Sequence, residues 1–509
     1  MMTLERDAAD FIARARARLE TADLRPRLRQ IGRVEEVGDG VAHVSGLPAT
    51  RLDELLRFED GTLGLAMRIG EAELGCILLS EGSGIRAGAA VEGTGEIARV
   101  PVGPGLLGRI VSPIGAPLDG GPAIEAERTD PVERPAPAIV DRDLVTEPLL
   151  TGITVIDAMI PLGRGQRGLI VGDRKTGKTT LASDTIINQR DSDVICVYAA
   201  IGQKASTVAR VAEAVRAHGA MERCIFVVGA ADAPPGAQWL TPYAACSIAE
   251  YFRDRGQHAL LIFDDLTKHA ITYRQLSLLL RKPPGREAYP GDVFYLHARL
   301  LERAAKLSQE KAGGSLTALP IAETQAGNPS AFIPTSLISI TDGQVYLEPK
   351  LFYEGQKPAV NVGMSVSRVG AKTQAKAIKS LADSLKLDYA QFLELEVFTR
   401  FGSMVDERTE RKIAHGRRLR AILAQPEYAP LPLSLQVALL LAVADGCLDD
   451  LPLSLIPEVR KRLAERLPQD LPRAARQIDE TGALSDETRR RLLTLIQDCV
   501  AGLAPKADD

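Results

Sequence analysis

The sequence has few cysteines and histidines, and neither residue type forms a cluster. The six cysteines stand far apart, and no pair of them has the spacing of a zinc site or a redox motif. The six histidines are scattered in the same way. A metal centre built from His or Cys is therefore not expected, and the cysteines are expected to be reduced thiols of a cytosolic protein.

Long apolar runs and an excess of positive charge are also missing. The longest apolar runs, such as VALLLAVA at 437–444, are far shorter than the roughly 20 residues that a membrane-spanning helix needs. The chain begins MMTLERDAADFIARARARLE, with early acidic residues and no apolar core, so no signal peptide is expected. Lys and Arg number 62 against 66 Asp and Glu, which gives no indication of a nucleic-acid partner.

The character of the sequence changes near residue 30. Residues 4–29 fit a helix with one narrow apolar side that suits docking, although a loosely ordered charged extension fits equally well; that side carries Leu4, Phe11, Ala15 and Leu19. Residues 30–98 alternate short β-rich runs with glycine turns, and Gly38-Asp39-Gly40 is typical of a hairpin. An N-terminal extension over 1–29 and a small β-barrel domain over 30–98 are predicted.

Residues 99–372 alternate strand-like runs with helical segments. The runs GLIVG, DVICVYAAIG, CIFVVGA and HALLIFDD are continuously apolar, as buried parallel strands are, so this region is predicted to be an α/β domain. After Lys372, amphipathic periodicity predicts a C-terminal helical bundle over 373–509. The whole chain is predicted to be a multidomain α/β protein.

The stretch GDRKTGKT matches a phosphate-binding loop between a strand and a helix. Glycines let backbone amides face phosphate oxygens, the loop lysine contacts the β- and γ-phosphates, and the hydroxyl after it can bind Mg²⁺. The nucleotide-binding residues predicted here are Gly172, Asp173, Arg174, Lys175, Thr176, Gly177, Lys178 and Thr179. The loop predicts that a nucleotide binds, against the alternative of a chance glycine loop. It does not predict that the nucleotide is hydrolysed.

An acidic partner for the metal is expected at the end of a later strand. The run ALLIFDD supplies it, and Asp264 is the predicted second Mg²⁺ ligand beside Thr179. The pattern alone does not distinguish Asp264 from Asp265. A strand-end acid with no metal role is the alternative.

Longer motifs give the sequence a family resemblance. The stretches GRGQRGLIVGDRKTGKTTLASDTIINQRDS, AIGQKAST, LLIFDDLTKHAITYRQLSLLLRKPPGREAYPGDVFYLHARLLERAAKL, SLTALPIAETQAG and VNVGMSVSRVG resemble the α subunits of F-type ATP synthases. The resemblance is clear over about 30–450. It implies a central P-loop domain of the RecA-like kind, flanked by the barrel and the helical bundle.

The resemblance also implies cofactors, partners and a location. The cofactors are ATP or ADP with Mg²⁺. The partners are β subunits in an alternating α3β3 ring, the central γ rotor stalk, the peripheral stalk, and a membrane sector that carries protons or sodium ions. The complex is expected at the cytoplasmic face of a bacterial inner membrane, with this chain bound peripherally.

Gln203 is the residue that the resemblance makes most informative. The catalytic β subunits of the family carry a glutamate at this place, which can act on the attacking water. A glutamine amide has no carboxylate and is a very poor base. The chain is therefore expected to bind Mg-ATP and to hydrolyse little of it. The alternative is that Gln203 orients the water, as a glutamine does in small GTPases.

Arg368, in SVSRVG, is the catalytic contribution that the resemblance implies. The matching family arginine reaches the active site of the neighbouring β subunit. There a guanidinium stabilises charge on the transferred γ-phosphoryl group. From the sequence pattern alone, such an arginine is more often part of a surface ion pair.

The base pocket is carried over from the family segments LFYEGQKP and LAQPEY. It is expected to contain Phe352, Lys357, Pro358 and Gln425, with Glu427 near them. The family usually has arginine in place of Lys357 and often glutamine in place of Glu427. Because arginine and lysine stack differently, nucleotide affinity can differ here. Ordinary packing between domains is the alternative role for these side chains.

Three departures from the family pattern indicate a divergent branch, such as the sodium-moving N-ATPase type. Lys175 replaces a common glutamine in the phosphate loop, and its charge should favour triphosphates. Asn328-Pro329 changes a loop that faces the rotor in the family. The segment LSQEKAGGSLTALP is shorter than in many relatives.

The function expected from the sequence is that of a non-catalytic, regulatory nucleotide-binding subunit of a rotary ATP synthase head. A self-sufficient homohexameric ATPase is one alternative, but it would need a carboxylate at 203. A structural scaffold with a vestigial loop is another, but Lys178, Thr179 and Asp264 are intact.

Overall fold

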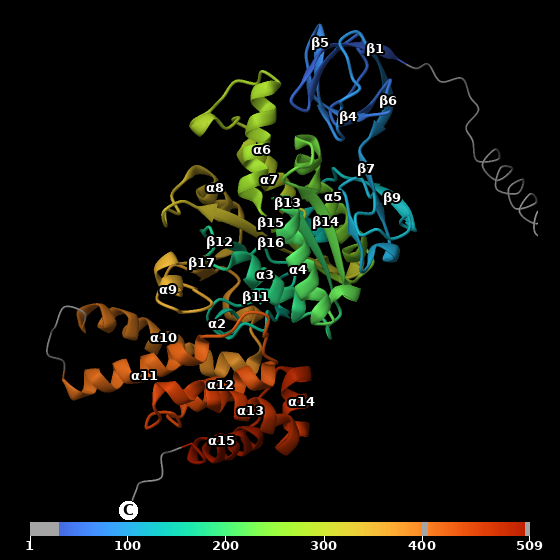
Figure 1. Cartoon of the computed structure of the whole chain (residues 1–509). Coiled ribbons are helices and arrows are strands. Elements are labelled where there is room, and N and C mark those ends of the chain that lie inside the picture. Colours follow the sequence, from blue (N-terminus) through green and yellow to red (C-terminus); the bar gives the residue numbers. More distant parts are fainter. Residues whose placement is uncertain (1–29, 400–405, 504–509) are drawn as a thin grey trace, which may run out of the picture.

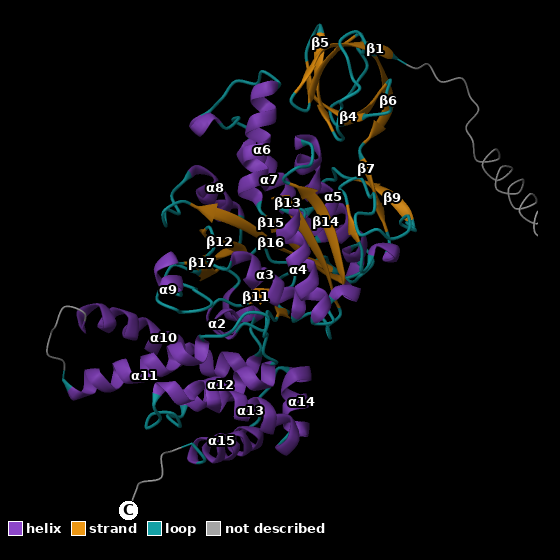
Figure 2. Ribbon diagram, viewed as in Figure 1, coloured by secondary structure: helices purple, strands orange, loops and turns teal. Residues whose placement is uncertain are grey.

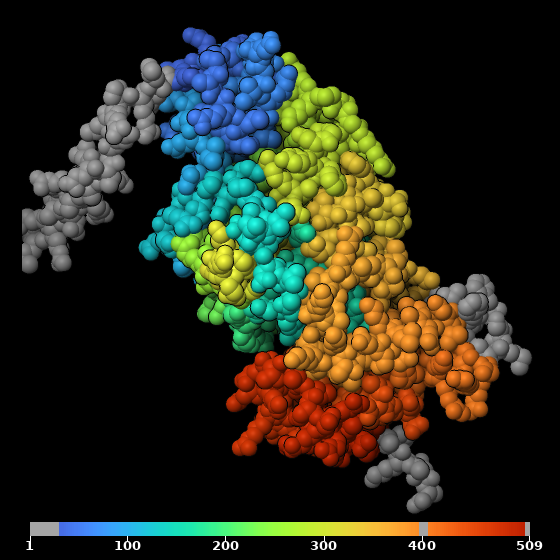
Figure 3. All heavy atoms as spheres, turned by 180° about the vertical axis from the view of Figure 1, so that it is seen from behind, coloured from blue at the N-terminus to red at the C-terminus, as the bar shows by residue number. Residues whose placement is uncertain are grey.

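The computed structural model describes residues 30–399 and 406–503 (Figure 1). The helix expected over 4–29 lies outside the described residues. A β-barrel, an α/β domain and a helical domain follow one another along the molecule, and Figure 3 shows the barrel and the last helices at opposite ends. This is the predicted fold class.

The barrel closes in the strand order β1-β2-β5-β4-β3-β6. Its first hairpin is confirmed: Gly38 pairs with Val41, and the two turn residues Asp39 and Gly40 both have positive φ, at 52° and 79°. A two-residue turn of this kind favours an Asp-Gly pair because its twist matches that of the strands. The strands are β1 (Ile31–Gly38), β2 (Val41–Ser45), β3 (Glu54–Phe58), β4 (Leu63–Ile69), β5 (Glu73–Leu78) and β6 (Ala90–Ile97).

An eight-stranded sheet forms the centre of the α/β domain, in the order β18-β17-β12-β16-β15-β13-β14-β8. The four strands expected from apolar runs are all present and parallel to their neighbours. The strands are β8 (Ile110–Val111), β12 (Leu169–Asp173), β13 (Val194–Gln203), β14 (Cys224–Ala230), β15 (His258–Asp264), β16 (Ser315–Thr324), β17 (Gly343–Leu347) and the antiparallel β18 (Val366–Ser367). Two small sheets pair β7 (Arg99–Val102) with β9 (Arg128–Pro131), and β10 (Pro148–Leu149) with β11 (Leu162–Gly163).

Helices cover both faces of this sheet (Figure 2). Along β13, Cys196 and Tyr198 join the apolar core on one side, whereas Ile195 and Val197 join the core on the other. A strand buried on both faces needs apolar residues at every position, which explains its continuous run. The helices are α2 (Thr154–Met159), α3 (Lys178–Ile187), α4 (Ala205–Ala217), α5 (Pro235–Arg253), α6 (Leu266–Leu279), α7 (Val293–Leu301), α8 (Phe332–Ile340) and α9 (Pro349–Tyr353).

The C-terminal domain packs its helices around α12 (Leu433–Ala444). The apolar run VALLLAVA lies in α12, whose residues 433–443 are all buried, so its apolar character on every side reflects a central position in the bundle. In the part of the chain that the structure describes, no helix has the length and apolarity to cross a membrane. The surrounding helices are α10 (Lys376–Thr399), α11 (Glu407–Leu423), α13 (Ile456–Asp470), α14 (Pro472–Thr481) and α15 (Asp486–Ala501).

Parallel strands end together at one edge of the sheet, and ligands of such folds bind at that edge. Here β12, β13, β15 and β16 end there. The loops that follow them therefore lie close together, and they form the site described next.

Candidate functional site

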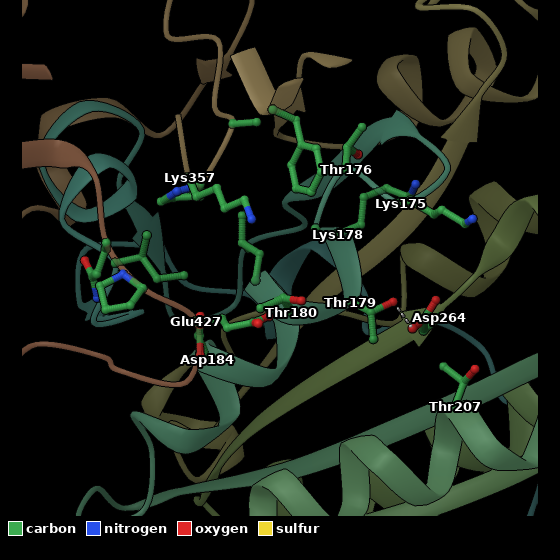
Figure 4. A pocket seen from close by; sticks show the side chains of 18 of the residues that line it. Lys175, Thr176, Lys178, Thr179, Thr180, Asp184, Thr207, Asp264, Lys357 and Glu427 are labelled. Atoms are coloured by element: carbon green, nitrogen blue, oxygen red, sulfur yellow. Dashed lines mark hydrogen bonds between the residues drawn. The ribbon is translucent and has the colours of Figure 1, made fainter. Parts of the chain in front are cut away.

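One cavity of about 660 Å³ joins the α/β domain to the C-terminal domain (Figure 4). Its walls come from the phosphate-binding loop, from the ends of β13, β15 and β16, and from the loop that connects α11 to α12. Most of the sequence-predicted site residues share this cavity. They are Lys175, Thr176, Gly177, Lys178, Thr179, Gln203, Asp264, Phe352, Lys357, Pro358 and Gln425.

The phosphate-binding loop connects β12 to the first turn of α3. Gly177 stands directly before that helix with φ at 97°, a left-handed conformation that a side chain would strain. The free N–H groups and the dipole of a helix N-terminus favour a bound anion. The backbone of the loop therefore favours an anion even before any side chain is considered.

The ammonium group of Lys178 lies inside this loop. Its Nζ donates to the carbonyl of Gly172 at 2.9 Å and also to that of Asp173. Burial lowers the pKa of Lys178, while the nearby carboxylates, Glu323 first among them, act in the opposite direction. A lysine ammonium has three protons. One therefore stays available for a phosphate oxygen.

Asp264, at the end of β15, is the most heavily hydrogen-bonded acid of the cavity. Its carboxylate accepts from the Thr179 hydroxyl at 2.8 Å, the Gln203 amide at 2.6 Å and the Tyr198 hydroxyl at 2.5 Å. The pairing of β13 with β15 sets Ala200 opposite Asp264, so Tyr198 and Gln203 stand on either side of that pair. Asp264 itself is almost completely buried.

The pair Thr179 and Asp264 fits a magnesium site. Hydroxyl and carboxylate oxygens are the ligands that Mg²⁺ takes beside phosphate, and here the two oxygens are 2.8 Å apart at the end of the loop. Asp265 does not share this position. Its carboxylate accepts from the backbone N–H of Lys268 at 2.7 Å and caps α6, and burial raises its pKa to about 6.

Gln203, at the end of β13, donates an amide proton to Asp264 at 2.6 Å. An amide cannot remove a proton from water at neutral pH. The other carboxylate at the phosphate end of the cavity is Glu323, the second-last residue of β16, which lies 3.5 Å from the Arg174 guanidinium. Sequence reasoning did not identify Glu323, although a strand-end acid beside a phosphate loop is the signal that could have found it.

The end of the cavity where the nucleotide base is expected contains the predicted aromatic ring and the predicted cation. The Lys357 ammonium stands 5.0 Å from the centre of the Phe352 ring. Gln425 also lines the cavity, and its side chain connects the two domains. Its amide donates to the carbonyls of Gly152 and Ala429, both at 2.8 Å, and its oxygen accepts from Thr154 at 3.2 Å. Because both amide protons are used, Gln425 holds the α11–α12 loop on the α/β domain.

Three predicted loop residues do not line the cavity. A side chain on Gly172 would meet the Leu347 carbonyl at 2.5 Å, so glycine is required there for packing. The Asp173 carboxylate accepts from Thr324 and from the Gly327 N–H, and so fastens the loop after β16. Arg174 is exposed.

Arg368 lies away from this cavity, directly after β18 at the edge of the sheet. It is exposed, and its guanidinium donates to the Ile338 carbonyl at 3.3 Å. It lines a second cavity of about 340 Å³, together with Arg142, Arg167, Lys306, Asp342 and Lys372 among others. Arg368 is therefore separate from the nucleotide cavity of its own chain.

Several residues that line the main cavity were missed. Thr180 and Asp184 lie on α3 one turn apart, and Thr207 and Arg210 lie on α4. Helical spacing after the phosphate loop could have identified the first two. Glu427, expected only near the base pocket, also lines the cavity.

Family models match three consecutive parts of the chain. The beta-barrel domain of the ATP synthase alpha/beta family matches residues 28–95, its nucleotide-binding domain matches 152–367, and the C-terminal domain of the ATP synthase alpha/beta chain matches 374–499.

Individual relatives match most or nearly all of this chain. "ATP synthase subunit alpha 3" of Paraburkholderia xenovorans is 55% identical over 98% of this chain and 95% of its own length. "ATP synthase subunit alpha 2" of Gluconobacter oxydans is 54% identical over 98% of this chain and 99% of its own. A protein of the latter name from Burkholderia pseudomallei is 58% identical over 89% of this chain and 68% of its own.

The hydroxyl of Thr179 can be tested as a metal ligand with the substitution Thr179→Val, which keeps the shape of the side chain. We expect the variant to lose most of the affinity that Mg²⁺ adds to ATP binding, about ten-fold or more. Metal-free ATP should bind as before. Titration calorimetry with and without Mg²⁺ measures both values.

Thr494→Val, on an exposed position of α15, is the matched control and should bind like the unaltered chain. If Thr179→Val kept the full Mg²⁺-dependent gain in affinity, Thr179 would not be a metal ligand.

Proposed function

The chain belongs to the ATP synthase alpha/beta family, and on that premise we propose that it is a non-catalytic α subunit of an F-type ATP synthase head. The observation that carries the proposal is the hydrogen bond from Gln203 to Asp264 inside an otherwise complete phosphate-loop cavity. The residues proposed to bind a nucleotide line one cavity, and an amide stands at the position proposed for the general base.

The proposed ligand is ATP or ADP with Mg²⁺. The loop N–H groups and Lys178 would hold the phosphates, and Thr179 and Asp264 would hold the metal, which neutralises phosphate charge when bound. Phe352 and Lys357 would contact the base. The size of the cavity supports this assignment, because about 660 Å³ is within the ~300–1,000 Å³ that small-molecule pockets span.

The low activity proposed for the chain alone follows from the same arrangement. Gln203 uses an amide proton on Asp264 and has no group that can accept a proton from water. A glutamine that orients water would have to release this bond first. Glu323 remains the one other acid near the phosphates among the described lining residues.

Arg368 is the proposed contribution of the chain to catalysis. It is exposed at the sheet edge and forms no ion pair among the described residues, so its charge is available to a partner. We place it in the active site of a neighbouring β subunit, where a guanidinium stabilises the transferred phosphoryl group.

The proposed assembly is a ring of three such chains and three β subunits around a central γ rotor stalk, held by a peripheral stalk. The complex would couple proton or sodium flow through its membrane sector to ATP synthesis or hydrolysis. Its place would be the cytoplasmic face of a bacterial inner membrane. The names of the bacterial relatives support the complex. Membership of an N-ATPase-type branch stays a prediction.

A self-sufficient homohexameric ATPase is the alternative. It would need a base at position 203 of every subunit, and the amide of Gln203 disfavours it.

The substitution Arg368→Ala tests whether this chain contributes to catalysis in a neighbouring subunit through Arg368 while it binds its own nucleotide independently. In the assembled complex we expect ATP turnover to fall by about 10³–10⁵, the range for a removed arginine finger. Nucleotide binding to this chain should not change, because Arg368 is outside its cavity. Steady-state turnover and equilibrium binding are measured on the same preparations.

Arg491→Ala is the control, because Arg491 is also an exposed arginine but lies on α15 and lines neither cavity. Turnover of the Arg368→Ala complex at the level of this control would exclude the finger role.

Lys175 provides a separate prediction about the phosphate loop. Its side chain is exposed, lines the cavity, and forms no ion pair among the described residues. We expect Lys175→Gln to weaken ATP binding several-fold and ADP binding less, because ATP carries more negative charge. Salt should reduce the difference, since exposed charges are screened within about 10 Å at 0.1 M. Unchanged ATP and ADP affinities at both low and high salt would refute this role.

A further inference from the structure

Two carboxylates stand at the end of the nucleotide cavity that is remote from Asp264. Asp184 belongs to α3, and Glu427 belongs to the loop between α11 and α12. Figure 4 shows the two residues next to each other. Because the phosphate loop fixes the other end of a bound nucleotide, this end is where the base would lie.

Asp184 is partly hydrogen-bonded and nearly buried. It is 7% exposed, and its Oδ1 accepts from the backbone N–H of Tyr428 at 2.7 Å. Its Oδ2 has no hydrogen-bond partner among the residues described. The titratable and charged groups around it are Glu427 and Tyr428 from the loop, Arg210 from α4, and His218 directly after α4.

These surroundings favour the protonated form of Asp184. Burial raises its pKa to about 7, and the negative charge of Glu427 acts in the same direction, against the Tyr428 N–H and His218. Two carboxylates that share one site do not ionise together easily. Near neutral pH the pair therefore offers one donor, on Asp184, and one acceptor, on Glu427.

Two other polar side chains at this end have partners of their own. Both amide protons of Gln425 go to backbone carbonyls. The Lys357 ammonium stands over the Phe352 ring. Asp184 and Glu427 are the two carboxylates at this end that can contact a base.

We infer that Asp184 and Glu427 select adenine, with Asp184 donating to a ring nitrogen and Glu427 accepting from the adjacent exocyclic amino group. Adenine presents an acceptor nitrogen beside its amino group. Guanine presents two neighbouring donors, N1–H and the 2-amino group, and these fit the pair only when both carboxylates are ionised. The inference rests on the proposed function, because it requires a nucleotide in this cavity.

The first test concerns the amino group. We compare the affinity of the full chain for Mg-ATP and for purine riboside triphosphate, which lacks the amino group but carries the same phosphates. ATP should bind about ten-fold or more tightly, the effect of one hydrogen bond to a charged group. Glu427→Ala should bring ATP to the level of the purine nucleotide.

Glu213→Ala, an exposed position on α4 that pairs with Arg216 and does not line the cavity, is the matched control and should keep the ATP preference. Equal affinity of the unaltered chain for the two nucleotides would overturn the inference. So would an equal loss for both in Glu427→Ala.

The second test concerns the proton on Asp184. The ratio of ATP to GTP affinity should fall between pH 6 and pH 8, as Asp184 ionises through about pH 7. The terminal phosphate titrates alike in both nucleotides, so its effect cancels in the ratio. Asp184→Asn keeps an acceptor for the Tyr428 N–H and always donates, so its ratio should not depend on pH. An unaltered chain whose ratio is constant with pH, or an Asn variant that titrates like it, would contradict the inference.

Failure of this inference differs from failure of the proposed function. If no nucleotide binds at all, the proposed function is wrong. If ATP, GTP and the purine nucleotide bind with equal affinity, the proposed function stands and the selection by Asp184 and Glu427 is wrong.

Discussion

The carboxylate of Asp264 accepts hydrogen bonds from a helix and from a neighbouring strand, and the organisation of the site depends on this interaction. Thr179 comes from the first turn of α3, and Tyr198 and Gln203 come from β13. Since a buried carboxylate without partners is costly, these contacts keep the phosphate loop, β13 and β15 in a fixed relation. The same oxygens are the ones that a metal beside the β- and γ-phosphates would use.

Under the proposed function, this interaction also separates nucleotide binding from catalysis. A glutamate at 203 would bring a second negative charge against Asp264, whereas the amide of Gln203 donates to it. The residue proposed to stand in place of the catalytic base is thus one that stabilises the binding site. Under the proposed function, the chemistry that the chain supports lies beyond its own cavity, where Arg368 is exposed at the sheet edge. Among the described acids that line the phosphate end of the cavity, Glu323 is the one besides Asp264 that could act as a base and give this chain hydrolytic activity.

The fold class, the first hairpin and the central strands could be predicted because continuous apolar runs and an Asp-Gly turn are local signals. The sequence could not show which of the adjacent residues Asp264 and Asp265 places its carboxylate in the cavity, because neighbouring side chains point in different directions and only the structure gives those directions. The hydrogen bond from the Gln425 amide to the Gly152 carbonyl, and the one from the Tyr428 N–H to Asp184, could not be predicted either. Both join residues about 240 or more positions apart, and only the packing of two domains brings them together.

The fate of ATP bound to the purified chain is the most direct test of the central claim. The chain is mixed with less Mg-ATP than protein, in the absence of other subunits, and the bound nucleotide is analysed over time. The account predicts that the nucleotide binds and remains ATP for hours. Conversion to ADP within minutes would contradict it, and loss of that activity in Glu323→Gln but not in Gln203→Ala would identify Glu323 as the base.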